Sequence, residues 1–473
     1  MTGVQTCALP ICSREAQSGR RLLGTNGGSL WLWPKRILNT LLSSLAAGVV
    51  PRSGAPYIAI GRKDEIASLL DNLETVRSGG AATRFLIGRY GSGKSFLIQL
   101  IRGYALEGGF LCLDADLSPE RRLTGGSGAG LATYRELMIN MSTKASPEGG
   151  ALVTVLSRYF TSLKTALIEE GYAPDTELFI DELRKRVHTK LSKLEGDVGG
   201  FDFARVLGEY FSAAIREDGD KMSSCLRYIR GEFANKTEAK AALGISVSTV
   251  IDDENWYNYL KLVAALSVEL GYAGTLVFID ECVNLYKIPN RISREANYEK
   301  LLSIFNDTLQ GKAKYMGIVF GGTPQFLEDE RRGLFSYDAL KSRLADSKYT
   351  SLGYQDLSSP VIRLRTLSPN ELLALVKRLA KLSAMRDGGE SSVTDEDAER
   401  FVSEALSRAG AQELITPREV IRDFLTILNI LRDNKDASFA ELMAKRRGAD
   451  DGDKPPKPVE APKKHIDLFD IDI

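Results

Sequence analysis

The sequence has 473 residues, 43% of them hydrophobic, and its 62 basic side chains balance 62 acidic ones. This length is more than one small hydrophobic core needs, so we expect two or three structural units. A protein whose whole surface bound nucleic acid would carry an excess of positive charge, so any contact with DNA must be local. No run approaches the ~18 apolar residues of a membrane-spanning helix, which argues against a membrane anchor.

Cysteine and histidine are scarce and dispersed. The five cysteines lie far apart except for Cys7 and Cys12, and His188 and His465 are the only histidines. This supply favours neither a zinc-binding cluster nor a histidine-based catalytic triad. We therefore expect buried free thiols and a reducing, cytoplasmic location.

The N-terminal residues, MTGVQTCALPI, lack the cationic start and the long apolar stretch of a signal peptide. They resemble the translation of a sequencing-adapter oligonucleotide, so we expect residues 1–36 to be non-native or disordered. Residues 37–83 are expected to form a helical lead-in. Its helices are predicted at Arg36–Ala47 and Lys63–Val76.

Five short apolar runs then alternate with longer segments of helical periodicity. Most of the runs are apolar throughout, which is typical of parallel strands buried on both faces. We predict an α/β core over residues 84–367, in which a helical insertion at about 130–270 separates the second and third strands. The strands are expected at Arg84–Ile87, Phe110–Leu113, Thr275–Ile279, Tyr315–Phe320 and Val361–Leu364.

Two helix-start signals mark a C-terminal helical segment. Ser368-Pro-Asn-Glu371 and Thr416-Pro-Arg-Glu419 both match a capping box with proline at the first helical position. We predict a helical lid domain at 368–446. The last residues, 447–473, contain four prolines and alternating acidic residues, so we expect a flexible tail.

Residues 88–95 match the G-x-x-x-x-G-K-S pattern of a phosphate-binding loop in full, between a predicted strand and a predicted helix at Phe96–Leu106. The glycines let backbone N–H groups face the β-phosphate of a nucleotide. Lys94 would lie between the β- and γ-phosphates, and the Ser95 hydroxyl would ligate Mg²⁺. The alternative is a glycine turn that binds nothing. We predict that ATP and Mg²⁺ are bound through Gly88, Arg89, Tyr90, Gly91, Ser92, Gly93, Lys94 and Ser95.

The third predicted strand ends in two acids, Asp280 and Glu281. Such a strand end would place Asp280 near the magnesium ion and Glu281 where it can polarise the attacking water. Alone the pattern is weak, because acids after buried strands often cap helices. Together with the phosphate loop it predicts a P-loop ATPase that hydrolyses ATP. The alternative is a nucleotide-dependent switch or scaffold with negligible turnover.

Two further residues are candidates for contacting the γ-phosphate. Thr323 follows the fourth predicted strand, with Gln325 as the reserve, and the alternative there is a turn without ligand contact. Arg418 lies in the first turn of a predicted lid helix, from which it could reach the phosphates. The alternative for Arg418 is a solvated surface arginine.

Three arginines beyond the fourth strand, Arg331, Arg332 and Arg343, occupy the region where oligomeric ATPases present an arginine to a neighbouring subunit. A solvated basic face is an equally good interpretation. Residues 237–250 imitate a DNA-binding helix-turn-helix, but the acidic run at 252–254 would repel phosphates. We favour an ordinary helical turn there over a DNA-binding initiator or loader.

The chain resembles the ATP-binding proteins of bacteriophage-exclusion (BREX) systems, of the BrxC/BrxD type, and related proteins of tellurite-resistance clusters. The resemblance spans roughly 37–446 and is carried by several stretches besides the phosphate loop. It implies an AAA+-like ATPase in a multiprotein anti-phage module, often beside a helicase-like protein, possible action on DNA, and a homo-oligomer. The stretches at 228–256 and 321–343 are the ones that point to this family, and they include Tyr228-Ile-Arg-Gly-Glu232, Ile251-Asp-Asp-Glu-Asn-Trp256 and Gly321-Gly-Thr-Pro324. The match also rests on Gly61-Arg62 and Ile415-Thr-Pro-Arg-Glu419.

Overall fold

The computed structural model describes residues 21–23, 29–31, 34–51, 54–126, 128–174, 176–191, 199–346, 356–407, 416–434 and 436–450. Most of the predicted non-native segment 1–36 and nearly all of the predicted tail 447–473 lie outside the described residues. The described residues before 34 form two short antiparallel strands, β1 (Arg21–Leu23) and β2 (Ser29–Trp31).

The chain divides into two compact units, each built from segments that are not continuous in sequence. Unit 1 consists of Met1–Ile66, Gly88–Tyr104 and Leu364–Ile473, and unit 2 consists of Ala67–Ile87 and Ala105–Arg363. The phosphate loop thus belongs to unit 1, although it follows directly on a strand of unit 2. The two units are described separately below.

Unit 2 contains a parallel sheet of five strands in the order β4-β5-β6-β3-β7. The predicted α/β fold class is confirmed, and each predicted strand is present with ends shifted by a few residues. The strands are β3 (Ala81–Ile87), β4 (Leu111–Asp116), β5 (Thr275–Asp280), β6 (Met316–Gly322) and β7 (Val361–Arg363).

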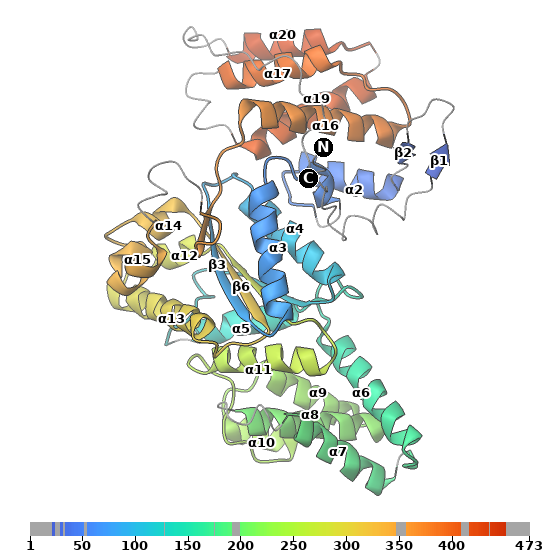
Figure 1. Cartoon of the computed structure of the whole chain (residues 1–473), viewed down its shortest axis with the longest axis vertical. Coiled ribbons are helices and arrows are strands. Elements are labelled where there is room, and N and C mark those ends of the chain that lie inside the picture. The colour runs from blue at the N-terminus through green and yellow to red at the C-terminus, as the bar shows by residue number, and fades with distance from the viewer. Residues whose placement is uncertain are drawn as a thin grey trace, which may run out of the picture. The chain divides into compact units, whose positions relative to one another are not determined.

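Helices cover both faces of this sheet. All six residues of β5 are buried, and since successive side chains of a strand point to opposite faces, neither face is open to water there. Val76 of α3 packs where a Cβ on Gly274 or Gly317 would lie, so these glycines allow a close approach of helix and sheet. Figure 1 shows α3 crossing in front of the strands. The helices in contact with the strands include α3 (Lys63–Arg77), α5 (Ala129–Ile139), α11 (Trp256–Glu269) and α13 (Arg291–Leu309).

The predicted helical insertion between the second and third sheet strands is confirmed. It appears in green in Figure 1 as a group of helices in which α7 packs on α8 and α8 on α9. Its helices besides α5 and α11 are α6 (Leu152–Glu169), α7 (Glu177–Leu191), α8 (Gly200–Ile215), α9 (Gly219–Ile229) and α10 (Lys236–Leu243).

The helix-turn-helix alternative is wrong, because the second helix does not form. Helix α10 ends at Gly244, whose φ of 65° closes it, and residues 245–255 contain no helix. The buried Asp202 carboxylate accepts hydrogen bonds from the backbone N–H groups of Ser248 (2.7 Å) and Thr249 (3.1 Å), so these N–H groups are bonded outside a helix. The favoured interpretation, an ordinary turn inside the insertion, is confirmed.

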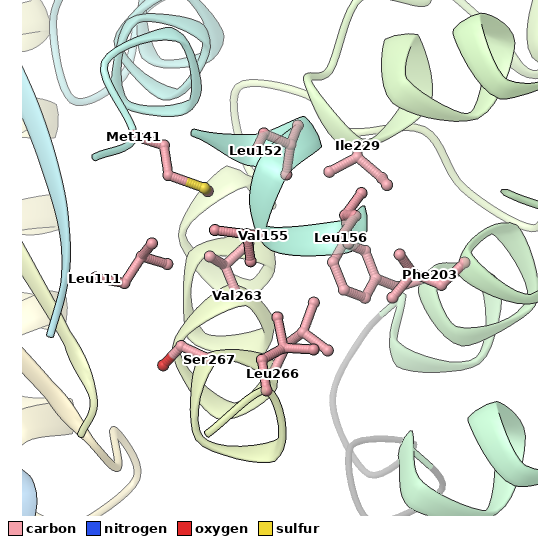
Figure 2. A pocket seen from close by; sticks show the side chains of 12 residues that line it. Leu111, Met141, Leu152, Val155, Leu156, Phe203, Ile229, Val263, Leu266 and Ser267 are labelled. Carbon is pink, nitrogen blue, oxygen red and sulfur yellow. The ribbon is translucent and has the colours of Figure 1, made fainter. Parts of the chain in front are cut away.

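A small cavity of about 10 Å³ lies in the core of unit 2. Figure 2 shows lining side chains from β4, α6, α8, α9 and α11, together with Met141, which follows α5. Ser267 is the polar residue among them, and its hydroxyl donates to the carbonyl of Ala264 at 2.7 Å. A space of this size holds at most about one water molecule and offers nothing to a phosphate, so we interpret it as a packing gap.

The remaining elements of unit 2 are short and follow the ends of β5 and β6. They are α12 (Val283–Tyr286), α14 (Pro324–Glu328), η4 (Leu334–Ser336) and α15 (Asp338–Leu344). Cys112 and Cys282 are buried thiols, as expected from the sequence, and Cys225 is buried as well. Among the residues that the structure describes, no helix has the length and apolar character needed to cross a membrane.

Unit 1 is helical and has its own apolar core. Helix α19 packs on α2 and α16, and the rings of Phe401 and Phe424 lie 5.1 Å apart at its centre. Both predicted capping boxes are confirmed, at Ser368–Glu371 and at Thr416–Glu419. The elements are α2 (Lys35–Ala46), η2 (Ala55–Ile58), α4 (Lys94–Glu107, its last turn in unit 2), α16 (Pro369–Asp387), α17 (Asp395–Ser407), α19 (Pro417–Asp433) and α20 (Phe439–Asp450).

Candidate functional site

The phosphate loop has the backbone geometry that its glycines were predicted to allow. Gly91 and Gly93 have φ values of 78° and 93°, a left-handed conformation that favours glycine. A Cβ on Gly93 would meet no atom within 4 Å, so the space beside it is open to a ligand. At Gly88 a Cβ would collide with the Ser92 hydroxyl, so this position accepts no side chain without rearrangement.

Lys94 begins helix α4 and folds back over the loop. Its Nζ donates to the carbonyl of Gly88 at 3.0 Å and to that of Arg89 at 3.3 Å. Ser95 follows in the first turn of the same helix. Because the first turn of a helix presents unpaired N–H groups and a positive dipole end, this start of α4 favours an anion.

The N-terminal turn of α19 is bonded to the phosphate loop within unit 1. Nη1 of Arg418 donates to the Tyr90 hydroxyl at 2.9 Å, and its guanidinium carbon lies 5.7 Å from the centre of the Tyr90 ring. Tyr90 is nevertheless 74% exposed. A Cβ on Gly91 would come within 2.7 Å of the Thr416 side chain, so the loop and this helix end are in close contact. The structure thus brings Arg418 to the predicted nucleotide-binding residues.

The predicted acidic pair lies at one edge of the sheet in unit 2. Asp280 ends β5 and is nearly buried, with 9% of its surface exposed, whereas Glu281 is exposed. Glu281 has a φ of 57°, and its backbone N–H donates to Oδ1 of Asp280 at 2.8 Å. A non-glycine residue in this conformation costs about 1–3 kcal/mol, and such residues cluster at functional sites. Glu217 and Tyr315 share this conformation, so the strain supports a role of Glu281 only together with its place directly after Asp280 at the end of β5.

A third carboxylate at this edge was not assigned a role from the sequence. Asp116 ends β4, directly opposite Asp280 in the parallel register. Asp116 is exposed, yet desolvation by the surrounding protein, together with the nearby carboxylates of Asp280 and Glu281, raises its pKa. The sequence shows that an acidic residue ends the strand before the insertion. It does not show that this residue lies next to β5, because that depends on the pairing of two strands more than 150 residues apart.

Thr323 follows β6 at the same edge and caps helix α14. Its side-chain oxygen accepts a hydrogen bond from the backbone N–H of Phe326 at 3.3 Å. The side chain is half-buried, while the reserve candidate, Gln325, is exposed. The capping bond leaves the Thr323 hydroxyl proton available to a further acceptor.

The three arginines beyond β6 differ in what they contact. Arg332 donates from Nη2 to the carbonyls of Tyr286 and Ile288, both at 3.3 Å, and stacks over the Tyr286 ring. Arg343 is exposed and bonds within its own helix, to the carbonyl of Ala339 at 2.7 Å. Arg331 is also exposed. Arg332 is thus anchored within the chain, whereas the other two face solvent.

The two side chains predicted from the sequence to bind magnesium both carry oxygen donors, which suit Mg²⁺ better than a softer metal. Mg²⁺ prefers oxygen ligands and is usually held by one or two protein side chains, with substrate phosphates and water completing its shell. Ser95 in unit 1 and Asp280 in unit 2 each carry a side-chain oxygen of this kind. In the described part of the chain, no three His, Cys, Asp or Glu side chains are grouped so that they could hold a metal by themselves.

The family model described as BREX system ATP-binding protein BrxC/D matches residues 34–447. This match covers all of the candidate site residues in both units. No curated protein matches the chain.

Proposed function

Because the chain belongs to the BREX system ATP-binding protein BrxC/D family, we propose that it hydrolyses Mg-ATP to drive or gate a multiprotein anti-phage complex. Membership in this family gives the chain an ATP-binding role in the BREX defence system. Hydrolysis is the further step, and one observation carries it. Glu281 is held in a strained left-handed conformation directly after the nearly buried Asp280, at the edge of the sheet from which β3 continues into the phosphate loop.

The residues of the loop and of the acidic pair have complementary parts in this proposal. Lys94 neutralises charge on the β- and γ-phosphates, and the N–H groups of the loop bind the β-phosphate. Ser95 and Asp280 would hold Mg²⁺, which would offset the charge that develops on the phosphates. Glu281 orients the attacking water and accepts its proton, a role open to an exposed carboxylate.

Two polar side chains complete the proposed site. Arg418 would exchange its bond to Tyr90 for a γ-phosphate oxygen, because a charged guanidinium binds an anion more strongly than a neutral hydroxyl. Thr323 would donate its hydroxyl proton to the γ-phosphate while its oxygen keeps capping α14. Both roles would favour ATP over ADP.

We propose further that the protein acts as a homo-oligomer, with other proteins of the defence module, among them a helicase-like protein, and on or near DNA. The exposure of Arg331 and Arg343 supports contact with a neighbouring copy. Mixing Lys94→Ala chains with Arg343→Ala or Arg331→Ala chains tests this. Activity above the sum of the separate variants supports action in trans, and activity equal to the sum argues against it.

Steady-state ATP turnover, measured with and without duplex DNA, tests the proposed reaction. We expect magnesium-dependent release of phosphate that is lost on chelation of the metal. ATP binding without turnover in either condition would favour the alternative, a nucleotide-dependent switch or scaffold. An increase of turnover with DNA would place the activity on or near DNA.

A further inference from the structure

Arg62 is a buried arginine with no part in the chemistry proposed above. It lies just before helix α3 and has 4% of its surface exposed. Burial lowers the pKa of its guanidinium, an effect partly offset by Glu65, which is itself 3% exposed and bonded to Nη1 at 3.3 Å. A buried charge is costly unless it is paired and hydrogen-bonded, so the partners of Arg62 are informative.

The guanidinium of Arg62 joins two segments of unit 1 that are distant in sequence. Its Nη2 donates to the backbone carbonyl of Ser92 at 3.0 Å and to that of Arg365 at 2.8 Å. Ser92 belongs to the phosphate loop. Arg365 lies three residues before Ser368, the first residue of the capping box at which helix α16 begins. One side chain therefore ties the loop to the start of the C-terminal helices.

The bonds around Arg365 make this junction well defined. Its own guanidinium pairs with both carboxylate oxygens of Glu371, at 2.5 and 2.7 Å, and Glu371 completes the capping box of α16. Gly61, with a φ of 71°, approaches so closely that a Cβ would lie 2.6 Å from Oε1 of Glu371. Gly61, the residue before Arg62, therefore packs directly against the Glu371 carboxylate that pairs with Arg365.

We propose that Arg62 is a positioning residue for the phosphate loop and that it transmits occupancy of the loop to the start of α16. The inference rests on the proposed nucleotide binding by this loop. With the Ser92 carbonyl held by Arg62, the peptide between Ser92 and Gly93 keeps one orientation, next to the open space beside the Gly93 Cα. A shift of the loop on binding phosphate moves the Ser92 carbonyl, and the shared Nη2 carries that shift to Arg365.

The chain offers a matched control for the loss of a buried arginine. Arg386, on α16 in the same unit, is 8% exposed and bonds to Ser383 and Asp387 rather than to the loop. Arg386→Ala should lower the melting temperature and leave nucleotide affinity unchanged. Arg62→Ala and Arg62→Lys should both weaken binding of a fluorescent ATP analogue by roughly tenfold or more, the effect of losing a charge-assisted hydrogen bond. Turnover of the lysine variant at saturating ATP should fall less than its affinity, because Arg62 does not touch the reacting atoms.

Amide hydrogen exchange tests the second half of the inference in the unmodified protein. ATP should slow the exchange of the amides at 366–372 in the wild type and in Arg386→Ala, but not in Arg62→Lys at saturating ATP. The inference is overturned if folded Arg62 variants bind ATP as tightly as the wild type. It is equally overturned if ATP leaves exchange at 366–372 unchanged in the wild type, a result that needs no variant to fold. Failure of the proposed function is recognised separately from the binding and turnover assays of the wild type: it would bind no ATP, or bind it without turnover. The exchange result counts against the inference only where the wild type binds ATP.

Discussion

The phosphate loop and the acidic edge reach their geometry in different ways. The loop is braced by side chains from other segments of unit 1, with Arg62 bonded to Ser92 and Arg418 bonded to Tyr90. The acidic edge is set by strand register, which places Asp116 opposite Asp280 and leaves Glu281 strained and exposed. Substitutions at the loop should therefore change nucleotide affinity, whereas substitutions at the edge should change turnover.

The largest expected effect on affinity is that of Lys94→Ala. This change removes the cation predicted to lie between the β- and γ-phosphates and both bonds that Lys94 makes to the loop backbone. We expect binding of ATP to weaken by roughly a hundredfold or more, since hydrogen bonds to charged groups contribute about 1.5–3 kcal/mol each. Titration calorimetry measures this. Lys381→Ala, an exposed lysine of α16 in the same unit, should bind ATP normally. Unchanged affinity of Lys94→Ala would remove the loop from the site.

Arg418→Ala should have an intermediate effect that depends on the nucleotide. If Arg418 moves from Tyr90 to the γ-phosphate, its loss should weaken ATP binding by about tenfold and ADP binding much less. Tyr90→Phe keeps the ring under the guanidinium and removes the hydroxyl partner, so it should leave ATP affinity equal or slightly higher. Equal losses for ATP and ADP in Arg418→Ala would contradict a contact with the γ-phosphate.

The smallest expected effect is on stability. It distinguishes the backbone strain at Glu281 from the role of its carboxylate in turnover. Glycine adopts a φ near 57° without steric cost, so Glu281→Gly should stabilise the fold by about 1 kcal/mol while turnover is lost. Glu217, an exposed residue with a φ of 55° beyond α8, provides the matched control. Glu217→Gly should gain similar stability and keep full turnover. Thermal unfolding of both variants measures the gain, and a loss of stability in Glu281→Gly alone would show that the carboxylate has a structural role.

Much of the fold follows from local patterns in the sequence. The five strands were predicted because each is a short apolar run, and the two capping boxes because their side chains bond within four residues. The first strand was predicted too short, since Ala81–Thr83 are small or polar and owe their strand conformation to pairing with β6. The helix-turn-helix alternative at 237–250 was wrong because of a residue some 46 positions earlier. The Asp202 carboxylate accepts hydrogen bonds from the backbone N–H groups of Ser248 and Thr249.

The candidate site was predictable where it is a motif and not where it depends on distant partners. The positions of the loop and of the acidic pair follow from short patterns beside apolar strands. The bonds of Arg62 to Arg365 and of Arg418 to Tyr90 span 303 and 328 residues of sequence. No periodicity or spacing in the sequence relates positions so far apart. In addition, the acceptors of Arg62 are backbone carbonyls, which every residue has, so the residue type at these positions does not indicate the bond.

The central claim is that this chain hydrolyses ATP with Glu281 as the residue that activates water. The most direct test compares ATP binding and steady-state turnover in Glu281→Gln, with Glu217→Gln as the control. The account predicts ATP affinity within about twofold of the wild type and turnover lower by ~10²–10⁴, the range that a positioned general base contributes. Turnover of Glu281→Gln at the wild-type rate would contradict it.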